Sequence, residues 1–218
     1  MENNNSKSNQ TPLPSGGAGG GFKLESSLLN MVLVLTGVAV IMGGVLAFVN
    51  HVTAAPIEEQ KKLALENGIK TVMQSDNLTV TQTDTVKMTD AKGKEQLYII
   101  YNNEKGAAVQ SSTMGFGGEL KVLVGFDTDG NILGYTLLEH QETPGLGAKA
   151  DQWFQKDGKG SIIGLNPGKK PLGVTKDKKA EEQQVDAITA STITSRAFLK
   201  AVNNAYNAYK TIPHETTD

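Results

Sequence analysis

Cysteine is absent from the 218-residue chain. The protein therefore has no disulfide, no iron–sulfur cluster held by thiolates and no flavin linked through sulfur. Histidine is scarce: the three, at positions 51, 140 and 214, are too few and too scattered for a histidine metal cluster. If the protein takes part in redox chemistry, an organic cofactor must supply it, because the remaining side chains are poor electron carriers.

Charge is also limited, both overall and locally. The formal net charge of -2 gives no sign of the basic patch that a nucleic-acid-binding protein usually has. Residues 26–57 contain no Asp, Glu, Lys or Arg, and residues 28–49 are the most apolar part. As a helix, this part would be about 33 Å long, which is enough to cross the hydrocarbon core of a bilayer.

Two other interpretations of this apolar segment are weaker. A core helix that is apolar on every side is unusual in a small domain, and the apolar region of a signal peptide is shorter, about 7–15 residues. We therefore expect a flexible polar tail at residues 1–25, a transmembrane anchor at 26–52 and a helical stalk at 53–76. We also expect Pro56 to occupy the first turn of the stalk helix.

The charges that flank the anchor are nearly balanced and do not fix its orientation. A short polar tail is the usual start of a signal anchor. This favours a cytoplasmic N-terminus, with the large domain outside the cytoplasm.

The rest of the chain predicts an α+β domain at residues 77–212, followed by a C-terminal tail at 213–218. An antiparallel sheet with flanking helices is expected, because strand-like segments precede a helix with one apolar face. The expected strands are 95–102, 119–127 and 132–140, the last two joined by the turn at 127–131. Residues 165–183 are expected to form a polar loop, and residues 192–210 the helix.

Hydroxyl side chains crowd the start of that last helix, within the segment DAITASTITS at residues 186–195. A helix N-terminus offers unpaired backbone N–H groups and the positive end of the dipole, so it is a natural place for a phosphate. Ser and Thr are equally favoured there as simple helix caps. The segment alone leaves both interpretations open.

Two glycine-containing loops are further candidates for a binding site. HQETPGLGAK, at residues 140–149, follows a predicted strand, and its proline and glycines force a turn with exposed backbone. Residues 115–118 hold three glycines, but no P-loop lysine accompanies them and a strand follows instead of a helix. Either loop alone could be an ordinary surface turn.

Taken together, the segments MGFGG, VLVGFDTDGNILGYTLLEHQETPGLGAK and DAITASTITSRAF resemble the FMN-binding domain of the Rnf complex protein RnfG. That family also includes NqrC, a component of the sodium-translocating NADH:quinone oxidoreductase. The resemblance covers approximately residues 24–209, and the length of the chain favours the Rnf type.

The resemblance implies that FMN is attached by a phosphoester to the last residue of the family's S/T-G-A-T pattern. Here the pattern is Thr189-Ala190-Ser191-Thr192, so Thr192 is the implied acceptor. Ala190 replaces the usual glycine, and Ser191 replaces the usual alanine and adds a second hydroxyl. Asp186 matches the acidic position associated with the flavin transferase, which moves FMN from FAD onto the threonine with the help of a divalent metal.

The expected cofactor is covalent FMN, with no resident metal and no catalytic side chain. The expected cofactor-binding residues are Thr192, Ser191, Thr189, Asp186, Glu142, Thr143, Gly145, Leu146, Gly147 and Gly117.

The resemblance further implies an electron-carrying part of an ion-translocating complex that links ferredoxin and NAD, not an enzyme on its own. Its expected partners are the other membrane subunits, the flavin transferase and the lipid bilayer. Its expected location is the inner membrane, crossed once, with the large domain on the periplasmic side.

Two alternatives remain open: a flavinylated carrier that works alone, and a colourless membrane-anchored binding module in which the hydroxyl cluster is only a cap. A hydrolase built on His140 and Glu142 is disfavoured, because the chain lacks a G-x-S-x-G nucleophile elbow.

Overall fold

The computed structural model describes residues 28–75, 80–89, 93, 95–177 and 182–212. The tails predicted at 1–25 and 213–218 lie outside these residues. The chain divides into two units, the first ending at Ala54 and the second beginning at Ala55. The first unit contains the N-terminal part of helix α1 (Leu28–Val72).

Within the described residues, α1 is the one helix that is long and apolar enough to cross a membrane. Its apolar window has a mean hydropathy of 2.6 and none of it is buried. The prediction that Pro56 begins a separate helix was wrong, because α1 continues through it. Proline removes one backbone hydrogen bond inside a helix, at a cost of about 3 kcal/mol. Favourable helix formers on either side, such as Ala55 before the proline and Glu58 after it, offset that cost.

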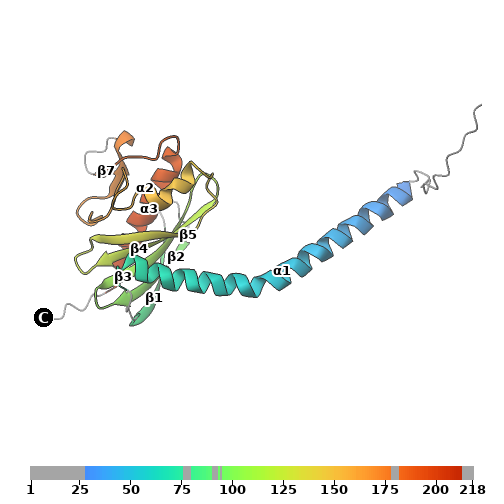
Figure 1. Ribbon diagram of the computed structural model, residues 1–218, viewed down its shortest axis with the longest axis horizontal. Helices are drawn as coiled ribbons and strands as arrows, with labels where there is room; N and C mark the ends of the chain where they lie inside the picture. Colours follow the sequence, from blue (N-terminus) through green and yellow to red (C-terminus); the bar gives the residue numbers. More distant parts are fainter. Residues whose placement is uncertain (1–27, 76–79, 90–92, 94, 178–181, 213–218) are drawn as a thin grey trace, which may run out of the picture. The chain divides into compact units, whose positions relative to one another are not determined.

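The second unit is built on a five-stranded antiparallel sheet, whose strands lie side by side in chain order (Figure 1). The predicted α+β class is therefore confirmed, and so are the three predicted strands. The first and third strands were not predicted, because one is polar and the other rich in small residues. The five are β1 (Gln82–Thr89), β2 (Glu95–Asn103), β3 (Gly106–Met114), β4 (Glu119–Asp127) and β5 (Ile132–Glu139).

The turn between β4 and β5 is organised by Asp127. Its carboxylate accepts hydrogen bonds from the backbone N–H groups of Asp129, at 2.9 Å, and Asn131, at 2.8 Å. Gly130 has a φ of +83°, a left-handed conformation that glycine adopts without strain. This turn fixes the hairpin that the sequence predicted.

Shorter elements and one long helix follow the sheet. They are η1 (Gly147–Lys149), α2 (Ala150–Trp153), β6 (Leu172–Val174), η2 (Thr175–Asp177), β7 (Gln183–Val185) and α3 (Thr192–Tyr209).

The stretch expected to be a polar loop, residues 165–183, contains more structure than predicted. β6 lies within it and pairs in parallel with β7, which begins at its end. Contacts with α3 stabilise this short ladder: the Asn203 side-chain amide accepts from the Leu172 N–H and donates to the Leu172 carbonyl, both at 2.9 Å. A three-residue strand that depends on such distant partners leaves no periodic pattern in the sequence.

One face of the sheet packs against α3 through a large apolar core. At its centre, the Phe198 ring stacks on Phe154, with centroids 4.4 Å apart, and meets Tyr135 edge-on at 4.8 Å. The Tyr135 hydroxyl donates to the Ala150 carbonyl at 2.6 Å. Burial raises the pKa of Tyr135, so its hydroxyl stays protonated and continues to donate.

The other face of the sheet packs against the C-terminal end of α1, where Ile69, Val72 and Met73 are buried. Near this contact the Glu139 carboxylate lies 2.7 Å from the Lys61 ammonium and 3.1 Å from that of Lys121. Hydrogen bonds from these two lysines lower the pKa of Glu139. The C-terminal end of α1 is therefore one layer of the folded domain.

Replacing Phe198 with alanine should lower the free energy of unfolding by about 3–5 kcal/mol, because it removes the centre of the α3 core and leaves a cavity. Chemical denaturation followed by circular dichroism measures the change. Lys200→Ala is the matched control on the exposed side of the same helix, and its effect should stay within about 0.5 kcal/mol. Equal losses in the two variants would contradict this account of the core.

Candidate cofactor site

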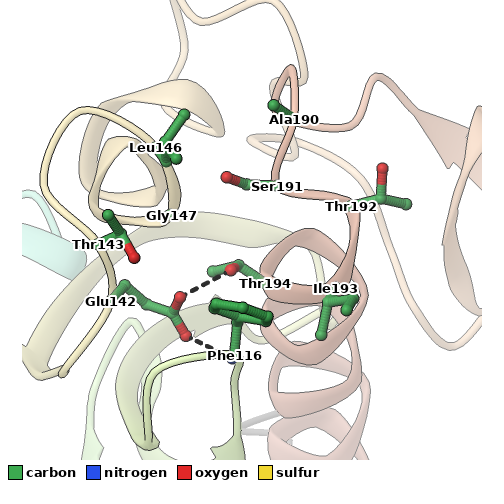
Figure 2. Close-up of a pocket in the computed structure, with 10 residues that line it drawn as sticks. All are labelled: Phe116, Glu142, Thr143, Leu146, Gly147, Ala190, Ser191, Thr192, Ile193 and Thr194. Atoms are coloured by element: carbon green, nitrogen blue, oxygen red, sulfur yellow. Dashed lines mark hydrogen bonds between the residues drawn. The ribbon is translucent and has the colours of Figure 1, made fainter.

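A cavity of about 380 Å³ lies where three segments meet: the loop after β3, the loop after β5 and the start of α3 (Figure 2). Its size falls within the range of about 300–1,000 Å³ that is usual for small-molecule sites. The residues that line it are Phe116, Glu142, Thr143, Leu146, Gly147, Ala190, Ser191, Thr192, Ile193 and Thr194.

The start of α3 is held in place by Ser195. Its hydroxyl donates to the Ser191 carbonyl and accepts from the Ile188 N–H, both at 2.9 Å. Ser195 is fully buried, so these bonds are shielded from water. The turn that leads into the helix is thus fastened to the helix from inside.

The helix N-terminus is not capped by its own side chain. Ser191 occupies the N-cap position but makes no side-chain hydrogen bond to the first turn. Ala190, just before it, has a φ of +60°, a left-handed conformation that is costly for a residue with a Cβ atom. Because a side-chain cap is missing, the positive end of the helix is open to an anion.

The two hydroxyls next to each other at this N-terminus point in different directions. Figure 2 shows the Ser191 hydroxyl directed toward Leu146 and Thr143, whereas the Thr192 side chain points away from them. Both residues line the cavity, and Thr192 is the more exposed of the two. A ligand at this helix end can therefore be reached by either hydroxyl, from different sides.

Glu142 ties the three segments together, with only 6% of its surface exposed. One carboxylate oxygen, Oε1, accepts from the backbone N–H of Phe116 at 2.8 Å and of Gly117 at 3.4 Å. The other, Oε2, accepts from the Thr194 hydroxyl at 2.8 Å. Buried charges need partners of this kind, because an unpaired carboxylate is costly to remove from water.

Two glycines make room for this carboxylate. A Cβ atom on Gly115 would collide with Oε1 of Glu142, and one on Gly147 would collide with Oε2 and with the Thr194 hydroxyl. These two glycines are therefore required by the close approach of side-chain atoms, and not by the flexibility of a surface turn.

Apolar side chains surround the cavity and remain exposed. Phe116 is 69% exposed, Ile193 55% and Leu146 42%. Large exposed apolar groups gathered around a cavity with a few polar groups are typical of a small-molecule site. The arrangement offers an apolar surface for a ring and a helix N-terminus for a phosphate.

The structure brings together most of the residues that were predicted to bind the cofactor. Thr192, Ser191, Glu142, Thr143, Leu146 and Gly147 line the cavity. Gly117 lies beside it, through its N–H bond to Glu142. Thr189, Gly145 and Asp186 are not among the lining residues.

Asp186 lies apart from the cavity. Its carboxylate accepts from the Thr175 hydroxyl at 3.3 Å, and its carbonyl accepts from the Trp153 indole at 2.8 Å. These contacts fix the chain just after β7, before it turns toward α3.

Four lining residues were not predicted from the sequence: Phe116, Ala190, Ile193 and Thr194. A signal for Phe116 was present, because a large aromatic residue between glycines has few neighbours to bury it. Thr194 was only one of several hydroxyls, and nothing in the sequence indicated that it would reach a carboxylate 52 residues away.

Comparison with known proteins first defines the class. Residues 115–207 match the FMN-binding domain family, so the cavity lies within a domain of flavin-binding type. Residues 25–72 match the RnfG N-terminal region.

Two relatives, each matched over most of its own length, identify the particular family. The RnfG-type protein of Shewanella piezotolerans, from an ion-translocating oxidoreductase complex, is 31% identical over 207 residues, which cover 86% of this chain and 93% of that protein. Its counterpart in the proton-translocating ferredoxin:NAD(+) oxidoreductase complex of Clostridium ljungdahlii is 32% identical over 187 residues, which cover 84% of this chain and 92% of that protein. The chain belongs to this family, the RnfG subunits of ion-translocating oxidoreductase complexes.

A solved structure is also similar: NqrC, from the Na(+)-translocating NADH-quinone reductase of Parabacteroides distasonis. It has 16% sequence identity and a TM-score of 0.47, and the match covers 72% of this chain and 97% of that chain.

Replacing Ala190 with glycine should raise the free energy of unfolding by about 1 kcal/mol, because glycine adopts a φ of +60° without the Cβ penalty. Thermal unfolding of the full chain measures this change. The matched control is Ala148→Gly in η1, where the same substitution should be destabilising because glycine loses more conformational freedom in a helical turn. Destabilisation by both substitutions would show that Ala190 is not strained.

Proposed function

We propose that this chain carries FMN joined by a phosphoester to Thr192 and relays electrons through it. The observation that supports this most is the position of Thr192 as the first residue of α3, at an uncapped helix N-terminus that borders the cavity. One end of the site suits a phosphate and the other suits a ring, as FMN requires.

The residues present fit the group. The first turn of α3 would hold the phosphodiester, whose remaining negative charge the helix dipole favours. Phe116, Leu146 and Ile193 would cover the ring, and Glu142 and Thr143 would form its polar side. When bound, FMN supplies one- or two-electron transfer; the protein positions it and limits its access to water.

Three further predicted residues have roles outside the cavity. Gly145 has a φ of +75°, and a Cβ atom built there would meet nothing within 4 Å, so the backbone conformation of the loop and not a lack of space favours glycine. Asp186 and Thr189 are exposed, which suits recognition by the flavin transferase that would load FMN.

The relatives provide the basis for a cellular role. The Clostridium ljungdahlii relative is named as part of a ferredoxin:NAD(+) oxidoreductase complex. By analogy, this chain would pass electrons between other redox subunits of such a complex while ions move across the membrane. Its partners would be those membrane subunits.

The apolar part of α1 would anchor the chain in the inner membrane. Its length and mean hydropathy of 2.6 are sufficient for a single span. The FMN domain would then lie on the periplasmic side of that membrane.

Flavin fluorescence in a denaturing gel tests the attachment. The full chain, co-expressed with a flavin transferase, should give a fluorescent band that Thr192→Ala abolishes, because the substitution removes the acceptor hydroxyl. Ser191→Ala is the matched control: it removes the neighbouring hydroxyl at the same helix N-terminus and should keep the band.

A band that survives Thr192→Ala but disappears in Ser191→Ala would move the acceptor by one residue. A wild-type chain that stays dark beside a fluorescent control flavoprotein would exclude covalent FMN. The membrane-anchored binding module would then be the better account.

A further inference from the structure

We propose that Glu142 is a positioning residue with a second role: its buried carboxylate holds the two glycine loops on α3, and its charge lowers the reduction potential of the flavin. The inference rests on the proposed FMN function. Glu142 lines the cavity and is only 6% exposed. Its carboxylate accepts hydrogen bonds from protein groups at the cavity wall.

The hydrogen bonds of Glu142 show how it braces the two loops against α3. Oε1 accepts from Phe116 and Gly117 in the loop after β3, and Oε2 accepts from Thr194 in the first turn of α3. Glu142 itself belongs to the loop after β5. One side chain therefore joins the three walls of the cavity, and Gly115 and Gly147 leave the space that it needs.

Bracing alone does not require a charge. A glutamine at position 142 could accept from the Phe116 N–H through its oxygen and donate to the Thr194 hydroxyl through its nitrogen. What the carboxylate adds is a negative charge in a partly dry site, where the effective dielectric is low. Reduction places additional electrons on the ring, so a nearby negative charge disfavours it and lowers the potential.

The electrostatic role is tested by a redox titration of the flavinylated full chain and its Glu142→Gln variant. Dithionite supplies the two electrons for each FMN, and solvent supplies the protons that the ring takes up. The variant should keep its flavin, and its reduction equilibrium should shift about tenfold toward the reduced form. For a two-electron couple this is a rise of about 30 mV.

Glu139→Gln is the matched control for this titration. It neutralises a carboxylate that is paired with Lys61 and Lys121 outside the cavity, so it should leave the potential unchanged. An unchanged potential in Glu142→Gln would overturn the electrostatic role. A Glu142→Gln variant that fails to take up FMN would also contradict the proposal, because the amide has the same shape and can still connect the Phe116 N–H to the Thr194 hydroxyl.

The bracing is tested separately, without FMN. Hydrogen exchange at the backbone amides of Phe116 and Gly117 should become faster in Glu142→Ala and stay slow in Glu142→Gln. If these amides still exchange slowly in Glu142→Ala, Glu142 does not brace the loops.

These outcomes are distinct from failure of the proposed function. If the wild-type chain carries no flavin, the proposed function fails, and the exchange measurement still decides whether Glu142 braces the loops.

Discussion

The packing of α3 against the five-stranded sheet is the constraint on which the candidate site depends. Phe198 is fixed between Phe154 and Tyr135, and Tyr135 belongs to the strand that precedes the loop at residues 140–147. This contact sets where the helix begins relative to that loop. The cavity is a consequence: it lies where a helix N-terminus, held from inside by Ser195, faces the ends of two strands.

The site combines this rigid support with local backbone strain at Ala190. Ala190 has a left-handed φ immediately before a helix whose N-cap gives no side-chain bond. Strain of this kind persists only where the surroundings hold it in place, and it is common at ligand sites. Here the internal hydrogen bonds of Ser195 supply that support, which leaves the hydroxyls of Ser191 and Thr192 available for a ligand.

Much of this was predictable from the amino-acid sequence, but unevenly. Two strand-like segments joined by a glycine-containing turn identified the β4–β5 hairpin, and helical periodicity identified α3, because both patterns are local. The polar first strand, β1, and the small-residue strand, β3, lack such a pattern and depend on their neighbours. The same holds for the site. Its glycines and hydroxyls could be predicted from the composition of short segments, whereas the hydrogen bond between Glu142 and Thr194 depends on tertiary packing.

The pairing of Asn203 with Leu172 has a consequence for how the molecule behaves at high concentration. A side-chain amide offers a donor and an acceptor, the same pair that an adjacent strand would present to a backbone residue. By occupying both backbone groups of Leu172, Asn203 closes the outer edge of β6 at that residue. Open edges recruit strands from other chains, so this single side chain protects the small parallel ladder against intermolecular aggregation.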